Sequence, residues 1–135
     1  MRMTVAGGEL YWVNRGTTQL GKQPYGSVRK AGTVAGSPVT VLVDLQYDQP
    51  YDLALTATDV YWVNFGAFGL TPLPNGLLPH NGKGALMRVP RAGGAPQTLL
   101  ASRYGPASIA VDDKCIYWAE WGATVAEGKI FLWAR

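Results

Sequence analysis

The side chains that could do chemistry are few and spread along the chain. His80 is the only histidine, so a Ser-His-Asp triad would have to use it, and no G-x-S-x-G motif accompanies it. In GLLPHNGKG the glycine spacing is one residue too long, and Gly84 follows Lys83 where a phosphate-binding loop has Ser or Thr. The sequence therefore predicts neither a hydrolase triad nor a nucleotide site.

Asp52, with the preceding Tyr51, is the best candidate for acid–base or metal chemistry. The two residues begin a segment of alternating apolar residues, a pattern that predicts a strand. The repeat described below aligns Asp52 with Arg2 and Ser108. One carboxylate with a cation and a hydroxyl makes a poor cage for a hard metal ion. We therefore expect Asp52 to form ion pairs, and we expect no metal and no cofactor.

The longest insertion, from Asn64 to Gly84, is the segment best suited to bind a ligand, because long loops on a rigid scaffold often carry binding residues. Two alternatives stay open. Its Asn-Gly pairs are also typical of turns, and its apolar residues could pack over a neighbouring blade or a second subunit. The candidate residues are Phe65, Phe68, Asn75, His80, Asn81 and Lys83.

A repeat determines where these residues lie. The pentapeptides LYWVN, VYWVN and IYWAE each contain Tyr-Trp, at intervals of 50 and 56 residues. Such a period is typical of a four-stranded β-propeller blade. Because adjacent residues of a strand point to opposite faces, we expect Tyr to fill one seam between blades and Trp the other, a structural role. The pairs are Tyr11-Trp12, Tyr61-Trp62 and Tyr117-Trp118.

Alignment on these pairs assigns up to four strands to each copy. Pro50 and Pro106 begin the first strand of the second and third copies, and the first two copies continue into a fourth strand at Val39 and Gln97. No 3.6-residue pattern extends over ten residues, so we expect almost no helix. The predicted fold is an all-β propeller segment, one domain over 1–135. Its three four-stranded blades span about 1–49, 50–105 and 106–135, the last one incomplete.

The segments PYDLAL, DVYWVN and GALMRVPRAGG resemble the YWTD-type six-bladed propellers of lipoprotein-receptor ectodomains. They are still more similar to bacterial propellers with Y-W-T-N and R-V-P-K-A-G-G repeats, often described only as hypothetical proteins, lipoproteins or sensor domains. The resemblance implies a six-bladed fold whose inner strands line a central channel, and a secreted or periplasmic location in many relatives. Val63 and Ala119 depart from it, since threonine is usual there.

Three blades are half of such a ring, so two blade faces would remain exposed. Large apolar patches are rare on soluble monomers. Two copies related by a two-fold axis would close a six-bladed ring and cover all four faces. We therefore expect either a homodimer that closes the ring or a piece of a longer chain.

Composition excludes several classes of protein. The chain has 135 residues, 47% of them hydrophobic and 16% charged, so disorder is not expected. The net charge is +3 and the basic residues form no cluster, so no nucleic-acid partner is expected. No run approaches the length of a membrane span, and the first residues do not resemble a signal peptide. The single cysteine, Cys115, is expected to be a small buried residue.

These features favour a non-enzymatic β-propeller module that serves as a scaffold and binds a protein or a small ligand. One alternative is a propeller enzyme of lactonase, lyase or hydrolase type acting at the central channel, for which Asp52 is the best-placed residue. A second is a structural fragment of a larger propeller protein. Glu120 beside Trp121 would suit a sugar-binding face, but one carboxylate does not make a glycosidase.

Overall fold

The computed structural model describes residues 2–16, 26–45, 49–66, 82–123 and 127–135, and every regular element among them is a strand. The strands form three antiparallel sheets, here called blades 1, 2 and 3. Blade 1 contains β1 (Arg2–Ala6), β2 (Glu9–Asn14), β3 (Gly26–Gly32) and β4 (Thr40–Leu45). Blade 2 contains β5 (Pro50–Leu55), β6 (Asp59–Asn64), β7 (Gly84–Pro90) and β8 (Gln97–Arg103). Blade 3 contains β9 (Pro106–Val111), β10 (Cys115–Glu120) and β11 (Lys129–Ala134).

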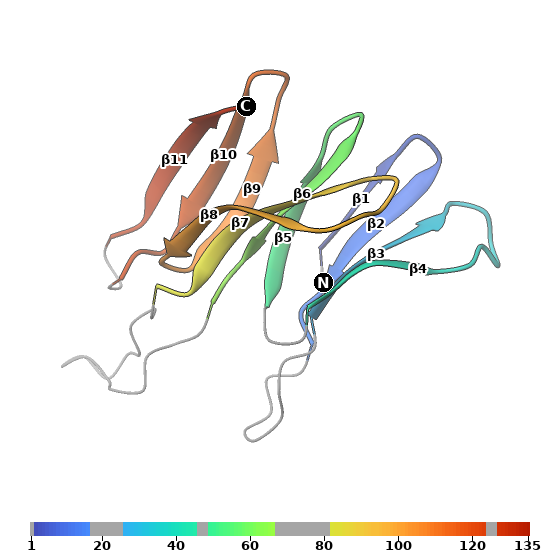
Figure 1. Cartoon of the computed structure of the whole chain (residues 1–135), viewed down its shortest axis with the longest axis horizontal. Coiled ribbons are helices and arrows are strands. Elements are labelled where there is room, and N and C mark those ends of the chain that lie inside the picture. Colours follow the sequence, from blue (N-terminus) through green and yellow to red (C-terminus); the bar gives the residue numbers. More distant parts are fainter. Residues whose placement is uncertain (1, 17–25, 46–48, 67–81, 124–126) are drawn as a thin grey trace.

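Each blade is an up-and-down meander whose strands pair in chain order. Short turns join the first two strands of every blade, and the turn in blade 1 consists of Gly7 and Gly8. Both have positive φ, 61° and 75°, which glycine adopts without the steric cost of a side chain. Figure 1 shows these three hairpin turns along one edge of the molecule, with the far ends of the same strands along the opposite edge. We call the latter the long-loop edge, because the 64–84 insertion starts and ends there.

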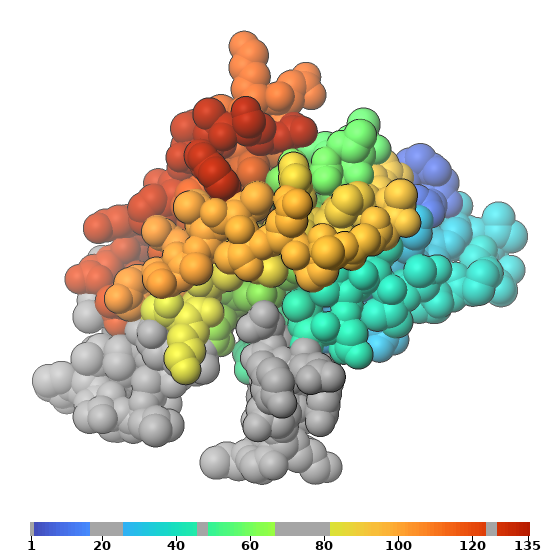
Figure 2. Space-filling model, viewed as in Figure 1, coloured from blue at the N-terminus to red at the C-terminus, as the bar shows by residue number. Residues whose placement is uncertain are grey.

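The blades follow one another as in a β-propeller, so the all-β propeller fold predicted from the sequence is confirmed. The first strand of blade 2, β5, contacts the first strands of both other blades, β1 and β9. These three strands are therefore the inner strands. Figure 2 shows blade 1, in blue and cyan, followed by blade 2 and then by blade 3 in orange and red.

The hydrophobic core consists of the two seams between blades. In the first seam, Tyr11 of blade 1 and Trp62 of blade 2 belong to one buried cluster. In the second seam, Tyr61 of blade 2 and Trp118 of blade 3 belong to another. Each blade thus turns its tyrosine towards the next blade and its tryptophan towards the preceding one, as adjacent residues of a strand must.

The same geometry leaves one uncovered face at each end of the row of blades. Trp12 on blade 1 and Tyr117 on blade 3 lie on these end faces and are only partly buried. Cys115 lies on the end face of blade 3 and is partly exposed, so the expectation of a buried cysteine is wrong. The reason is that neither of the other two described blades covers that face.

Candidate functional site

A glycine turn presents one side chain from each blade at the long-loop edge. The strand that carries Tyr-Trp ends in Asn or Glu, one residue follows, and then comes Gly16, Gly66 or Gly122 with φ between 75° and 89°. At Gly66 a Cβ atom would lie 2.6 Å from the nitrogen of Gly84, and at Gly122 it would lie 2.7 Å from Cβ of Glu127. Both φ and space therefore require glycine there, and the chain must turn immediately after the presented residue.

The presented residues are Arg15, Phe65 and Trp121, one from each blade. Two of them are fixed through the backbone to the chain just before an inner strand. The amide of Phe65 donates to the carbonyl of Gln49 at 2.9 Å, and that of Trp121 donates to the carbonyl of Gly105 at 3.1 Å. Their backbone positions are therefore set by the scaffold rather than by the long insertion.

Together with Tyr51 these side chains form a continuous row across the three blades, which we call the aromatic row (Arg15, Tyr51, Phe65 and Trp121). The guanidinium carbon of Arg15 lies 4.2 Å from the ring centre of Tyr51. Tyr51 stacks on Phe65 with centroids 5.0 Å apart, and Phe65 meets Trp121 edge-on at 5.8 Å. Such contacts are the preferred geometries of cation–π and aromatic pairs.

Exposure differs along the aromatic row. Phe65 is buried, whereas Trp121 is 54% exposed. Arg15 is partly buried, and its Nε is a buried donor with no hydrogen-bond partner among the described residues. The row therefore offers a surface tryptophan supported by a buried phenylalanine, with a partly buried cation at its other end. Tryptophan, tyrosine and arginine are enriched among the residues that dominate protein–protein binding energy.

Asp52 lies near the aromatic row and joins the three inner strands. Its carboxylate accepts hydrogen bonds from Nε of Arg2 at 3.2 Å and from Oγ of Ser108 and the amide of Ile109, both at 3.1 Å. The amide of Leu53 donates to the same carboxylate at 3.0 Å. The side chain is 9% exposed. Arg2, Asp52 and Ser108 thus meet as the alignment of the repeats predicts, and the carboxylate serves to connect blades.

A second carboxylate, Glu120, is buried in the seam between blades 2 and 3. It accepts hydrogen bonds from Nε of Arg103 at 2.5 Å, from Nε1 of Trp118 at 2.6 Å and from the amide of Tyr104 at 3.3 Å. The strand registers align Glu120 with Asn64, and Arg103 with Leu45 of blade 1. An ion pair here therefore replaces the asparagine and leucine of the first seam. It borders a cavity of about 330 Å³.

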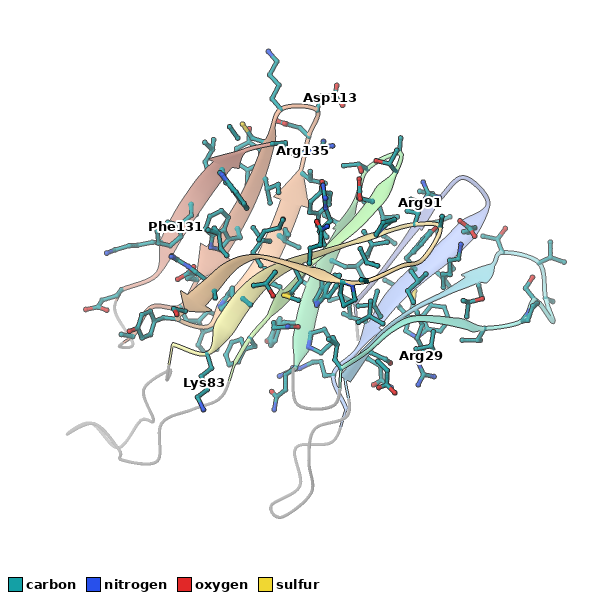
Figure 3. The ribbon with its side chains drawn as sticks, in the orientation of Figure 1. Arg29, Lys83, Arg91, Asp113, Phe131 and Arg135 are labelled. Carbon is teal, nitrogen blue, oxygen red and sulfur yellow. The ribbon has the colours of Figure 1, made fainter. Side chains whose placement is uncertain are left out.

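The edge opposite the long-loop edge, which carries the hairpin turns, is called the hairpin-turn edge. There an arginine of blade 2 contacts the tyrosine of blade 1, and an arginine of blade 3 contacts the tyrosine of blade 2. The guanidinium of Arg91 lies 5.0 Å from the ring centre of Tyr11 and donates to its hydroxyl at 2.8 Å. Arg135 lies 5.7 Å from the ring of Tyr61 in the same way. Figure 3 shows Arg91 and Arg135 towards this edge, with Lys83 at the opposite one.

Glu9 completes the cluster around Arg91. Its carboxylate accepts hydrogen bonds from the hydroxyl of Tyr11, from Nζ of Lys30 at 2.9 Å and from Arg91 at 3.4 Å. These hydrogen bonds lower the pKa of Glu9 from 4.5 to about 2. The bond from the Tyr11 hydroxyl contributes most, followed by the bond from the Lys30 ammonium. The bond to Tyr11 also raises the pKa of Arg91. Glu9 is thus an anion throughout the neutral range, and its role is to connect blades 1 and 2.

The structure brings together some of the residues that the sequence singles out for ligand binding. Tyr51 and Phe65 lie in the aromatic row, and Asp52 lies beside Tyr51. Lys83 is exposed, and its backbone runs next to Gly66. The remaining four, in the 64–84 insertion, lie outside the described residues: Phe68, Asn75, His80 and Asn81.

Sequence reasoning missed Arg15 altogether and considered Trp121 only as a sugar platform. A signal for both was present in the repeat, because each copy of the motif is followed by one residue and a glycine. Aligning that residue across the three copies selects Arg15, Phe65 and Trp121.

Comparison with known proteins supports the fold. No protein-family model matches the chain, and a search of curated proteins gave no match. Among solved structures, the crystal structure of a nidogen/laminin complex is similar, with a TM-score of 0.60 and 15% identity over 92% of this chain. The match covers 43% of that chain, so this protein spans less than half its length. At this identity the likeness shows the propeller fold alone.

Two features are absent from the described residues. No helix in those residues is long and apolar enough to cross a membrane. No three His, Cys, Asp or Glu side chains within the described part gather as metal ligands would.

Proposed function

We propose that this chain is a β-propeller scaffold that binds a protein partner through the long-loop edge, with the aromatic row at the centre of the contact. The observation that carries the proposal is the row itself. A tryptophan is held half exposed on a rigid turn and supported by a buried phenylalanine, and a partly buried arginine lies at the other end of the row. Rigid anchors of this kind lose little conformational freedom on binding.

A protein partner fits this surface better than a small molecule does. Small ligands usually occupy concave pockets that enclose most of their surface. The row instead runs across three blades and ends on an exposed indole. The nidogen/laminin structure is a complex between proteins. This agrees with the proposal without identifying a partner for this chain.

The geometry of Asp52 argues against catalysis there. A general base needs a lone pair directed at a substrate proton. The Asp52 carboxylate instead accepts four hydrogen bonds from Arg2, Leu53, Ser108 and Ile109. These bonds occupy the lone pairs that an acid–base reaction at the inner strands would use.

Selection from a phage-displayed peptide library against the folded protein tests the proposal. Peptides enriched on the wild type should bind Trp121→Ala about 30-fold more weakly, since a central tryptophan anchor contributes about 2 kcal/mol or more. Trp133→Ala is the matched control, because Trp133 is exposed on the same blade away from the aromatic row and borders a separate cavity. Equal binding by the wild type and Trp121→Ala would contradict the proposal, as would a library that yields no binder.

A further inference from the structure

The end faces of the molecule consist of the residues that form the seams inside it. Strand register aligns Met3 with Leu53 and Ile109, which are each 7% exposed in a seam, yet Met3 is 60% exposed. Register likewise aligns Ile130 of blade 3 with Val28 and Leu86. These two are 0% and 1% exposed, whereas Ile130 is 81% exposed. Blade 1 and blade 3 therefore each present a largely apolar face that no described residue of another blade covers.

At three positions the end faces lack charges that the seams carry, whereas Arg29, paired with Trp12, places one charge on the face of blade 1. Both seams within the chain carry an acid, a base and an arginine at corresponding positions: Glu9, Lys30 and Arg91 in the first, and Asp59, Arg88 and Arg135 in the second. At the end faces the corresponding residues are Cys115, Leu132 and Thr33. Loss of all three charges makes exposure of these faces to water more costly. It favours an apolar occupant.

We propose that the occupant is a second copy of this chain, with blade 3 of each copy packed on blade 1 of the other. One chain carries both halves of a blade-to-blade interface, so two copies supply two complete interfaces. Head-to-tail contacts of this kind form a closed ring when blade 3 of the second copy also packs on blade 1 of the first. The nidogen/laminin match agrees, because this chain spans 43% of that propeller chain and two copies would span most of it.

The area is sufficient for a stable dimer. A face three strands wide and six residues long covers about 300 Å² in projection, from a strand spacing of about 4.8 Å and a rise of about 3.3 Å per residue. Four such faces come to about 1,200 Å², which reaches the size of specific protein interfaces.

The dimer also completes the aromatic row. In the second seam Phe65 packs edge-on against Trp121, the same position of the next blade. Across the new seam the next such residue is Arg15 of the second copy, so the exposed indole of Trp121 would lie beside a guanidinium. Indole is the best aromatic partner for such a cation. This consequence for binding rests on the proposed function, whereas the dimer rests on the end faces alone.

A pair of opposite charges tests the interface. Val28 and Leu53 share the first buried cluster, and Leu86 and Ile109 share the second, so Ile130 is expected to lie against Met3 of the second copy. By sedimentation velocity at micromolar concentration, wild type should have about twice the 14.5 kDa mass of one chain. Ile130→Lys and Met3→Glu should each be monomeric. An equal mixture of the two should be dimeric, with one seam holding the new ion pair and the other unchanged.

Val34→Lys is the control, because Val34 is 77% exposed in the turn between β3 and β4 and should leave the dimer intact. Circular dichroism checks that each variant is folded. If a variant does not fold, the mass of the wild type alone tests whether the dimer forms. A monomeric wild type, dimeric single variants or a monomeric mixture would overturn the dimer. None of these outcomes depends on peptide binding, so failure of the proposed function is seen separately.

Discussion

Glu9 shows how individual side chains stabilise contact between blades. The carboxylate lies where blades 1 and 2 meet at the hairpin-turn edge, and it accepts hydrogen bonds from a phenol, an ammonium and a guanidinium. Two of these donors, Tyr11 and Lys30, belong to its own blade, and Arg91 belongs to the next. Tyr11 and Lys30 therefore stabilise the ionised form of Glu9 within blade 1, and Arg91 adds the part that depends on packing of the two blades.

The lowered pKa makes the contribution of Glu9 dependent on pH. The pKa of Glu9 is about 2 in the folded protein and 4.5 in the absence of these contacts. Between pH 2 and pH 4.5, Glu9 is therefore protonated more in the unfolded chain than in the folded protein. The stabilisation is therefore complete above pH 4.5 and is lost as the pH falls towards 2. We expect Glu9→Gln to lower Tm most at pH 5 and above, and the difference from wild type to vanish near pH 2. Calorimetric melts at equal protein concentration measure it, and a Tm difference independent of pH would refute this role.

At the scale of elements, the inner strands β1, β5 and β9 are connected through a single carboxylate. Asp52 of β5 accepts from Arg2 of β1 and from Ser108 and Ile109 of β9. The bond to the Ile109 amide is buried, whereas Arg2 is 62% exposed. The link to β9 should therefore contribute more to stability than the link to β1, because water screens an exposed ion pair and competes little for a buried amide.

Two substitutions separate these links. Asp52→Ala leaves the Ile109 amide and the Ser108 hydroxyl without their acceptor, and we expect the free energy of unfolding to fall by about 2–3 kcal/mol. Arg2→Ala removes only the exposed ion pair and should cost less than about 1 kcal/mol. Urea denaturation at a fixed protein concentration measures both. If Arg2→Ala proved as damaging as Asp52→Ala, the ion pair would be the main link and this ranking would be wrong.

The elements could be predicted from the sequence because the repeat supplies the same strand pattern three times. The Tyr-Trp pairs identify the second strand of each blade, and strand alternation then assigns Tyr and Trp to opposite seams. The aromatic row could not be predicted in the same way, because it depends on residues from three blades meeting at one edge. Arg15 and Phe65 share a position in the repeat but differ in chemistry, so the repeat aligns them without showing that their side chains meet in one surface.

The exposure of Cys115 illustrates the same limit. The sequence places it on an aromatic strand, where a cysteine is usually buried. Its exposure depends on which face the next blade would cover, and that requires the number of blades in the chain. Local patterns thus predicted strands and faces, whereas burial at the two ends was decided by the whole assembly.

At the scale of the whole molecule, the three blades form an open row whose two end faces repeat the surfaces of its interior. Met3 on one face and Ile130 on the other take the places of residues that are buried in the seams. The proposed dimer joins these faces. It would also place Arg15 of one copy beside Trp121 of the other, so assembly and partner binding are linked at the long-loop edge.

The most direct test of this account is the mass of the unmodified protein in solution. Size-exclusion chromatography with multi-angle light scattering, over a range of micromolar concentrations, should give a single species of about twice 14.5 kDa. Folded protein that elutes with the mass of one chain throughout that range would contradict the closed ring.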